Sequence, residues 1–196
     1  SGTVGMTRTG SWESAMDSRP IPANKVVENF EYHALFMVPN NSWSYIIDLY
    51  SMRILWWQQA LTYYDASGAK IAVPGISIVP MQDYLLSVKR VKVDEANTNF
   101  EWRVENLSDN SVQTALTGSG LALPANPPTW RIGHPSGNFN HVASCFFICN
   151  SDDTDTDRSE QLQSWLRNAY NGGSSSAPSG NAQSTNNQWY QLYDSK

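Results

Sequence analysis

Charged side chains are scarce in this sequence. Asp, Glu, Lys and Arg make up 16% of its 196 residues, against about a quarter in an average soluble domain. The 13 Lys and Arg residues are scattered and are outnumbered by 18 Asp and Glu, so that the net charge is −5. A nucleic-acid-binding protein needs a positive footprint on the phosphates. We therefore expect no direct contact with nucleic acid.

Long apolar runs are also lacking. No stretch approaches the roughly 18–20 residues that cross a bilayer as a helix, so we expect no membrane span. The sequence does not begin with a charged segment followed by an apolar one, which is the pattern of a secretory leader. If the protein is exported, we expect this chain to be the mature form or a part of a larger precursor.

Cysteine is limited to two residues, Cys145 and Cys149. On one strand, residues four apart are separated by roughly 13 Å at about 3.3 Å per residue. A disulfide joins Cα atoms within about 7 Å, so these two thiols do not pair with each other. Their spacing also differs from the C-x-x-C of zinc and redox sites. We predict two buried free thiols.

Aromatic residues, by contrast, are abundant: they make up 12% of the chain and include eight Trp. Two adjacent pairs are Trp56-Trp57 and Tyr63-Tyr64. Because neighbouring side chains on a strand point to opposite faces of the sheet, one ring of each pair faces away from the other. Exposed Trp and Tyr stack on sugars and contact proteins. We predict that these four residues form a ligand or interface surface, with coverage of the second face by other elements as the alternative.

Short segments rich in β-branched and aromatic residues, separated by turn signals, fill most of the chain. We expect strands within residues 26–38, 43–57 (with a bend), 60–64, 69–73, 76–79, 84–93, 100–105, 112–116, 129–132, 142–149 and 189–193. A hairpin turn is expected at 65–68. The alternation is cleanest in 100–105 and slips at Lys89-Arg90, which predicts a bulge or an edge strand there. This pattern predicts an all-β fold, a two-sheet antiparallel sandwich of jelly-roll or immunoglobulin-like topology.

Three other segments complete the organisation. Residues 1–24 are rich in Gly, Ser, Thr and Pro, which predicts an extended N-terminal arm or linker before a single domain at 25–196. Apolar residues recur at helical spacing in 158–170, which predicts one short helix. The Ser/Asn/Gly tract at 174–188 has the composition of a flexible linker.

An acidic run precedes the expected helix and allows two interpretations. Asp153, Asp155 and Asp157 alternate, with Glu160 beyond, and Ca²⁺ prefers several carboxylate oxygens. The glycine and the distant bidentate Glu of a calcium loop are missing, however. Asp157 and Glu160 have the spacing of an N-cap and an N3 residue, and carboxylates in a first turn favour the helix dipole. We predict mainly a helix start, with calcium as the alternative.

Catalytic motifs are not evident, so we assign no catalytic residue. The stretch around His134 and Ser136 lacks the G-x-S-x-G order of an esterase. A hydrolase using Ser136, His134 or His141, and the acidic run is conceivable. The third histidine, His33, alternates with apolar neighbours, which indicates a hydrogen-bonded sheet residue. A glycosidase needs two carboxylates across a cleft, and no pair stands out among Glu28, Glu31, Asp48, Asp83, Glu101 and Glu105.

Taken together, these features favour a protein that is not an enzyme and works by surface contact. We predict a viral coat-protein domain, either shell or projecting spike, on architectural analogy alone. Its partners would be copies of itself or capsid neighbours, with a glycan or host receptor as ligand, at the virion surface or outside the cell. No cofactor is required, apart from the calcium alternative. The two alternatives are a carbohydrate-binding module or lectin, and a β-sandwich hydrolase.

Overall fold

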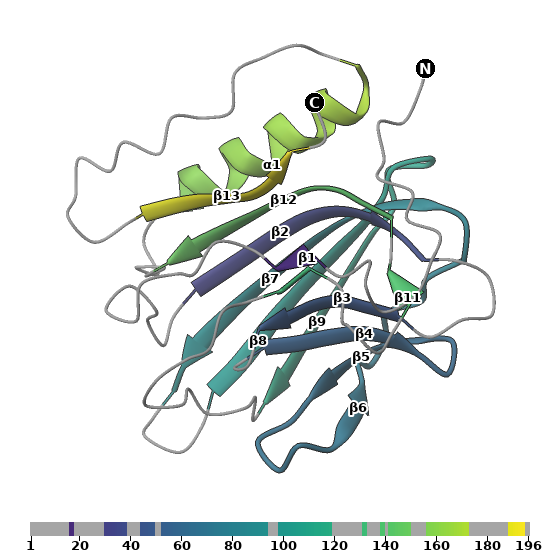
Figure 1. Ribbon diagram of the computed structural model, residues 1–196, viewed down its shortest axis with the longest axis vertical. Helices are drawn as coiled ribbons and strands as arrows, with labels where there is room; N and C mark the ends of the chain where they lie inside the picture. Colours follow the sequence, from purple (N-terminus) through teal and green to yellow (C-terminus); the bar gives the residue numbers. More distant parts are fainter. Residues whose placement is uncertain are drawn as a thin grey trace.

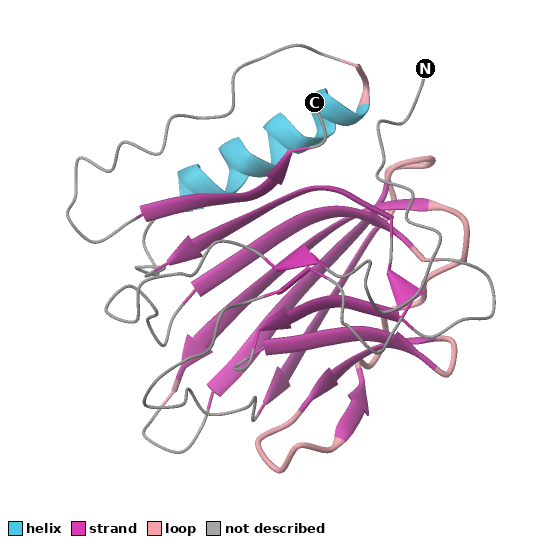
Figure 2. Cartoon of the chain, in the orientation of Figure 1, coloured by secondary structure: helices cyan, strands magenta, loops and turns pink. Residues whose placement is uncertain are grey.

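Two β-sheets packed face to face, with one helix on the outside, form the computed structural model (Figure 1). The structure describes residues 16–17, 30–38, 44–49, 52–93, 98–118, 131–132, 138–139, 141–149, 156–172 and 188–194. Strands dominate this part of the chain and the helix lies along one edge of it (Figure 2). The prediction of an all-β, two-sheet sandwich with one short helix is confirmed.

The first sheet has seven strands. Its hydrogen-bonded path is β1-β10-β3-β4-β5-β6, and β11 pairs with β3 in parallel. The bounds are β1 (Met16–Asp17), β3 (Ser44–Leu49), β4 (Met52–Trp57), β5 (Ala60–Tyr64), β6 (Lys70–Ala72), β10 (Arg131–Ile132) and β11 (Asn138–Phe139). Strand β1 lies within the predicted arm at 1–24 and pairs with β10; the rest of that arm lies outside the described residues.

The second sheet has six antiparallel strands in the order β13-β12-β2-β7-β8-β9. The bounds are β2 (Phe30–Met37), β7 (Asp83–Lys92), β8 (Thr98–Asn106), β9 (Val112–Gly118), β12 (His141–Cys149) and β13 (Gln188–Asp194). The aromatic C-terminal segment therefore docks as a final strand, as its composition predicts. Of the predicted Ser/Asn/Gly tract 174–188, only Gln188 is described, as the first residue of β13, and the rest lies outside the described residues.

The β5–β6 hairpin shows how the sequence sets local geometry. Asp65 Oδ1 accepts hydrogen bonds from the backbone N–H groups of Ser67 and Ala69, each at 2.9 Å. Gly68 has φ of +80°, a conformation that costs a glycine little and other residues more. The turn predicted at 65–68 is confirmed.

Alternate residues of both sheets fill the space between them. Aromatic rings form the centre of this core: Tyr63 of β5 lies 5.6 Å from Phe100 and 5.7 Å from Trp102, measured between ring centroids. Trp102 also donates its indole N–H to Thr117 Oγ1 at 2.9 Å, so its one polar atom is satisfied. Strand β8 alternates as its sequence predicts, with Phe100, Trp102 and Val104 inside.

Two predicted features are wrong. Residues 76–79 form no strand, because the backbone of Ser77 bonds to a side chain: Ser77 N–H donates to Gln113 Oε1, and Gln113 Nε2 donates to Ser77 O. Lys89-Arg90 marks neither a bulge nor an edge, since β7 lies between β2 and β8 in unbroken register. The alternation slips there because Arg90 is buried on the inner face.

Helix α1 (Thr156–Tyr170) covers part of the outer face of the second sheet (Figure 1). Leu162, Trp165 and Leu166 pack against Leu35 and Leu85, in a cluster separate from the sandwich core. The helix starts two residues before the predicted 158, so Asp157 lies in its first turn and is not the N-cap. The helix ends at Tyr170, as the sequence predicts, and Gly172 two residues beyond it has φ of +82°.

No helix of the described residues is long and apolar enough to cross a membrane.

Candidate catalytic site

Polar side chains occupy the outer face of the second sheet beside α1. Antiparallel pairing places residues of neighbouring strands directly opposite one another, with their side chains on the same face. One such row runs from His33 of β2 through Ser87 of β7 and Arg103 of β8 to Thr114 of β9. A hydroxyl, an imidazole and a guanidinium are therefore held side by side on rigid backbone.

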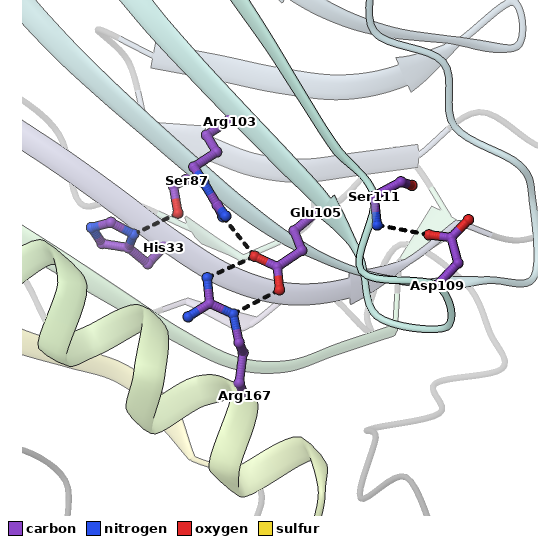
Figure 3. A network of polar contacts seen from close by, with 7 residues as sticks. All are labelled: His33, Ser87, Arg103, Glu105, Asp109, Ser111 and Arg167. Atoms are coloured by element: carbon purple, nitrogen blue, oxygen red, sulfur yellow. Dashed lines mark hydrogen bonds and ion pairs between the residues drawn. The ribbon is translucent and has the colours of Figure 1, made fainter.

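His33 connects a hydroxyl to a carboxylate. Its Nδ1 lies 2.8 Å from Ser87 Oγ, and its Nε2 lies 2.9 Å from Glu31 Oε2 (the Ser87 contact is drawn in Figure 3). A neutral imidazole has one donor and one acceptor nitrogen. Because a carboxylate only accepts, Nε2–H donates to Glu31, which leaves Nδ1 to accept the hydroxyl proton of Ser87. The three groups form a directed chain from hydroxyl to carboxylate.

Glu31 is held ionised at the end of this chain. Burial by itself raises the pKa of Glu31, but the hydrogen bonds from His33 and Ser159 Oγ and the charge of Lys89 favour the ionised form, and the net effect is a lowered pKa. Ser159 is on the first turn of α1 and donates to the same oxygen as His33. Ser159 of the helix thus holds the carboxylate of Glu31 in place, and this carboxylate in turn orients the imidazole of His33.

A cavity of about 470 Å³ opens beside this chain, between α1 and the sheet. A cavity of this size is typical of small-molecule sites. His33 is only 2% exposed and Ser87 only 7%, yet both line the cavity wall. Side chains or backbone of twelve residues line it: Glu31, His33, Ser87, Val88, Lys89, Glu101, Trp102, Arg103, Thr114, Ala115, Ser159 and Gln163.

An ion cluster closes one end of the polar face (Figure 3). Glu105 accepts two hydrogen bonds from Arg167 of α1, Nε to Oε1 and Nη2 to Oε2, both at 2.7 Å. Arg103 Nη1 lies 2.7 Å from Glu105 Oε2. These contacts, with that of Arg167 the largest, lower the pKa of Glu105 although burial opposes them. The same pairing raises the pKa of Arg167.

The four aromatic residues predicted as a binding surface divide between the two faces of the first sheet. Trp56 and Tyr63 lie in the core, so they are not surface residues, and that part of the prediction is wrong. Trp57 and Tyr64 reach the outer face, as the alternation predicts. Lys70 Nζ lies 3.7 Å from the centroid of the Trp57 ring and 6.0 Å from that of Tyr64.

The sequence-based candidates for catalysis and calcium are not brought together in the described part of the chain. Ser136, His134, Asp153 and Asp155 lie outside the described residues. His141 begins β12 and Asp157 lies in α1, without a described side chain, and Glu160 is exposed on α1. Among the described residues, no group of three His, Cys, Asp or Glu is placed to hold a metal ion. The calcium site stays a prediction.

Ser87, Arg103, Ser159 and Gln163 were missed by sequence reasoning. A usable signal was present: next to His33, Ser87 and Arg103 on their strands, several residues out of phase with the core are charged, namely Glu31, Lys89, Glu101 and Glu105. What the sequence does not reveal is that a helix covers this face, which turns solvated positions into a cavity wall.

Comparison with known proteins gives little that resembles this chain. No family model matches it, and no curated protein matches it. Among solved structures, it is similar to a scytalido-glutamic peptidase crystallised with a transition-state analogue inhibitor. The identity is 14%, the match covers 62% of this chain and 73% of the peptidase, and the TM-score is 0.32. We transfer no residue role from that peptidase.

The prediction of a non-catalytic viral coat-protein domain is wrong, and so is the prediction that the protein is not an enzyme. Within the chain itself, a buried histidine contacts both a hydroxyl and a carboxylate beside a cavity. This arrangement belongs to a reaction centre more naturally than to an assembly surface.

Proposed function

We propose that the protein is a β-sandwich hydrolase that cleaves acyl bonds with Ser87 as the nucleophile. The observation that carries the proposal is the chain of hydrogen bonds from Ser87 through His33 to Glu31 at the cavity wall. A serine hydroxyl is a weak nucleophile, and an adjacent base activates it. The same roles recur on unrelated folds and are recognised by geometry.

The reaction follows from the direction of the hydrogen bonds. Ser87 Oγ attacks the carbonyl carbon of the substrate while its proton passes to His33 Nδ1. The imidazolium then returns this proton to the leaving group as the bond to the carbonyl carbon breaks. Water attacks the resulting ester of Ser87 by the same route, with its proton again taken by His33. The imidazolium then returns this proton to Ser87 Oγ as the acyl bond breaks, so that the products are the free acid, the protonated leaving group and the regenerated serine hydroxyl.

Glu31 and Ser159 position the base. Glu31 fixes the tautomer with Nε2 protonated and stabilises the positive charge that His33 carries after proton transfer. Ser159 holds Glu31 in place from α1. Neither residue exchanges a proton with the substrate.

The outer face of the first sheet supports the lectin alternative less well. The ammonium group of Lys70 lies directly over one face of Trp57, in a cation–π contact. A sugar that stacked on this face would have to displace it. The hydrolase is therefore the function that we take forward.

The test is hydrolysis of 4-nitrophenyl esters by the purified chain and by Ser87→Ala. The expected result is Ser87-dependent turnover that falls by at least about 100-fold in the variant. The matched control is Ser164→Ala, an exposed serine on α1, which should keep the wild-type rate. Urea unfolding of both variants shows whether the fold is kept. A folded Ser87→Ala variant with the wild-type rate contradicts the proposal.

A further inference from the structure

Arg103 is the cation nearest to the proposed nucleophile in the strand register. It lies directly opposite Ser87 on the neighbouring strand, and side chains so placed have Cβ atoms about 4.5–5.5 Å apart. Its side chain is 30% exposed, and it lines the cavity. A group bound to Ser87 would therefore lie beside a guanidinium.

The charge of Arg103 is only partly neutralised by the protein. Its ion-pair partner, Glu105, already accepts both hydrogen bonds of the Arg167 fork. Two guanidinium groups thus share one carboxylate, and this cluster of three side chains carries a net positive charge. Arg167 is occupied by its two-point pairing and does not line the cavity, so the surplus charge faces the cavity through Arg103.

The remaining charged side chains of the cavity wall lie in a neighbouring row. Glu31, Lys89 and Glu101 are directly opposite one another on β2, β7 and β8. This row is negative overall, and its Glu31 is engaged by His33 and Ser159. The cavity therefore has a negative side at this row and a positive side at Arg103, and Ser87 lies in the row of Arg103.

We propose that Arg103 binds an anionic group of the substrate, so that the site takes acyl compounds with a carboxylate near the scissile carbonyl. The inference rests on the proposed function and names its substrate class. Guanidinium and carboxylate match in geometry, and charge-assisted hydrogen bonds between them are about twice as strong as neutral ones. Arg103 takes no part in the bond-making steps, which Ser87 and His33 carry out.

The test compares two substrates that differ by one negative charge. The first is mono(4-nitrophenyl) adipate, which has a free carboxylate, and the second is methyl 4-nitrophenyl adipate, in which that carboxylate is a neutral methyl ester. We expect wild-type kcat/KM to be about 10-fold to 100-fold higher for the anion. Most of the difference should lie in KM and should shrink as salt is added. Arg103→Gln should cleave the two esters with kcat/KM values within about twofold of each other, and Arg103→Lys should keep part of the preference.

Arg167→Gln is the matched control. It removes a neighbouring guanidinium that does not line the cavity, so the preference for the anionic ester should persist even if stability falls. A preference that is lost equally in both variants would show that only the net charge matters, and this would overturn the role of Arg103. Wild-type protein that cleaves both esters equally, in a Ser87-dependent manner, overturns the inference but leaves the proposed function standing.

If no ester is turned over, a binding measurement still tests the anion site at Arg103 separately from the proposed hydrolase function. Calorimetric titration of Ser87→Ala with the monomethyl adipate anion measures the anion site without catalysis. Saturable binding that Arg103→Gln abolishes supports the inference even if the hydrolase proposal fails. No binding at millimolar concentration to a folded Ser87→Ala variant overturns it.

Discussion

Arg167 of α1 and Glu105 of β8 form a two-point ion pair, with both nitrogen–oxygen distances at 2.7 Å. Two further hydrogen bonds also join the helix to carboxylates of the sheet. Ser159 donates to Glu31 of β2, and Tyr170 donates to Asp83 of β7 at 3.0 Å. Helix α1, which forms one wall of the cavity, is therefore hydrogen-bonded to three strands, with contacts near both of its ends.

Removing the Arg167–Glu105 ion pair should weaken the docking of α1 on the sheet. Arg167→Ala leaves the buried Glu105 with Arg103 alone, and we expect the free energy of unfolding to fall by about 1–3 kcal/mol. Breaking a fully buried ion pair would lower the free energy of unfolding by more than this. That larger loss is not expected here because Arg167 is about one-third exposed. Urea titration followed by circular dichroism measures the change.

The control for this prediction is Gln161→Ala, at an exposed position of the same helix, which should shift stability by less than about 0.5 kcal/mol. Equal effects of the two substitutions would show that the ion pair does not anchor the helix.

Acid should weaken the contribution of Glu105 in a defined direction. The pKa of Glu105 is lower in the folded protein than its ordinary value of 4.5. A carboxyl of this kind adds stability at pH above its unfolded pKa, and this stability is lost as pH falls through the folded pKa. The wild-type protein should therefore exceed Glu105→Gln in stability at pH 7, and the difference should shrink below about pH 4.5.

Urea titrations of both proteins between pH 7 and pH 3.5 give this difference. A stability gap that stays constant over the whole range would mean that the ionised carboxylate contributes nothing beyond the shape of its side chain.

Apolar packing should contribute more to the docking of α1 than any single polar contact. Leu166 is fully buried against the outer-face leucines Leu35 and Leu85. Leu166→Ala should lower the free energy of unfolding by about 2–5 kcal/mol, because it removes buried methyl groups and leaves a cavity. Leu116→Ala, at a residue 64% exposed on β9, should cost less than about 0.5 kcal/mol. If the two costs were similar, the helix would not be packed on the sheet as described.

Period-two patterns carried the prediction of the fold. The alternation of residues 100–105 and the turn at 65–68 are local, since each depends on neighbours along the chain. The segment 76–79 failed because its backbone partner is the side chain of Gln113, 36 residues away. The prediction of a bulge or edge at Lys89-Arg90 failed for a different reason. Arg90 is a charged residue at an inner position, and such a residue looks like a break in the alternation.

The site was less predictable because it is assembled across strands. His33 was correctly predicted as a hydrogen-bonded sheet residue, and Glu31 was among the candidate carboxylates. Ser87, however, is 54 residues from His33 in sequence and Ser159 is 128 residues from Glu31. Strand order brings the first pair together and helix docking the second, and neither can be obtained from spacing along the chain.

His33 should be the base on which turnover depends. His33→Gln keeps a polar side chain of similar length but cannot accept and return a proton, so we expect kcat to fall about 100-fold to 10,000-fold. KM should change much less, because His33 does not hold the substrate in place. Ester hydrolysis under saturating substrate measures kcat, and urea titration confirms the fold. A folded His33→Gln variant with unchanged kcat would remove His33 from the mechanism.

The most direct test of the account is covalent labelling of Ser87. A fluorophosphonate probe phosphonylates activated serines, and mass spectrometry of the intact protein and of its peptides finds the adduct. We predict one adduct, on Ser87, that is absent from Ser87→Ala and strongly slowed in His33→Gln. An adduct on Ser136, or no adduct on the folded wild-type protein, would contradict the claim that Ser87 is the nucleophile.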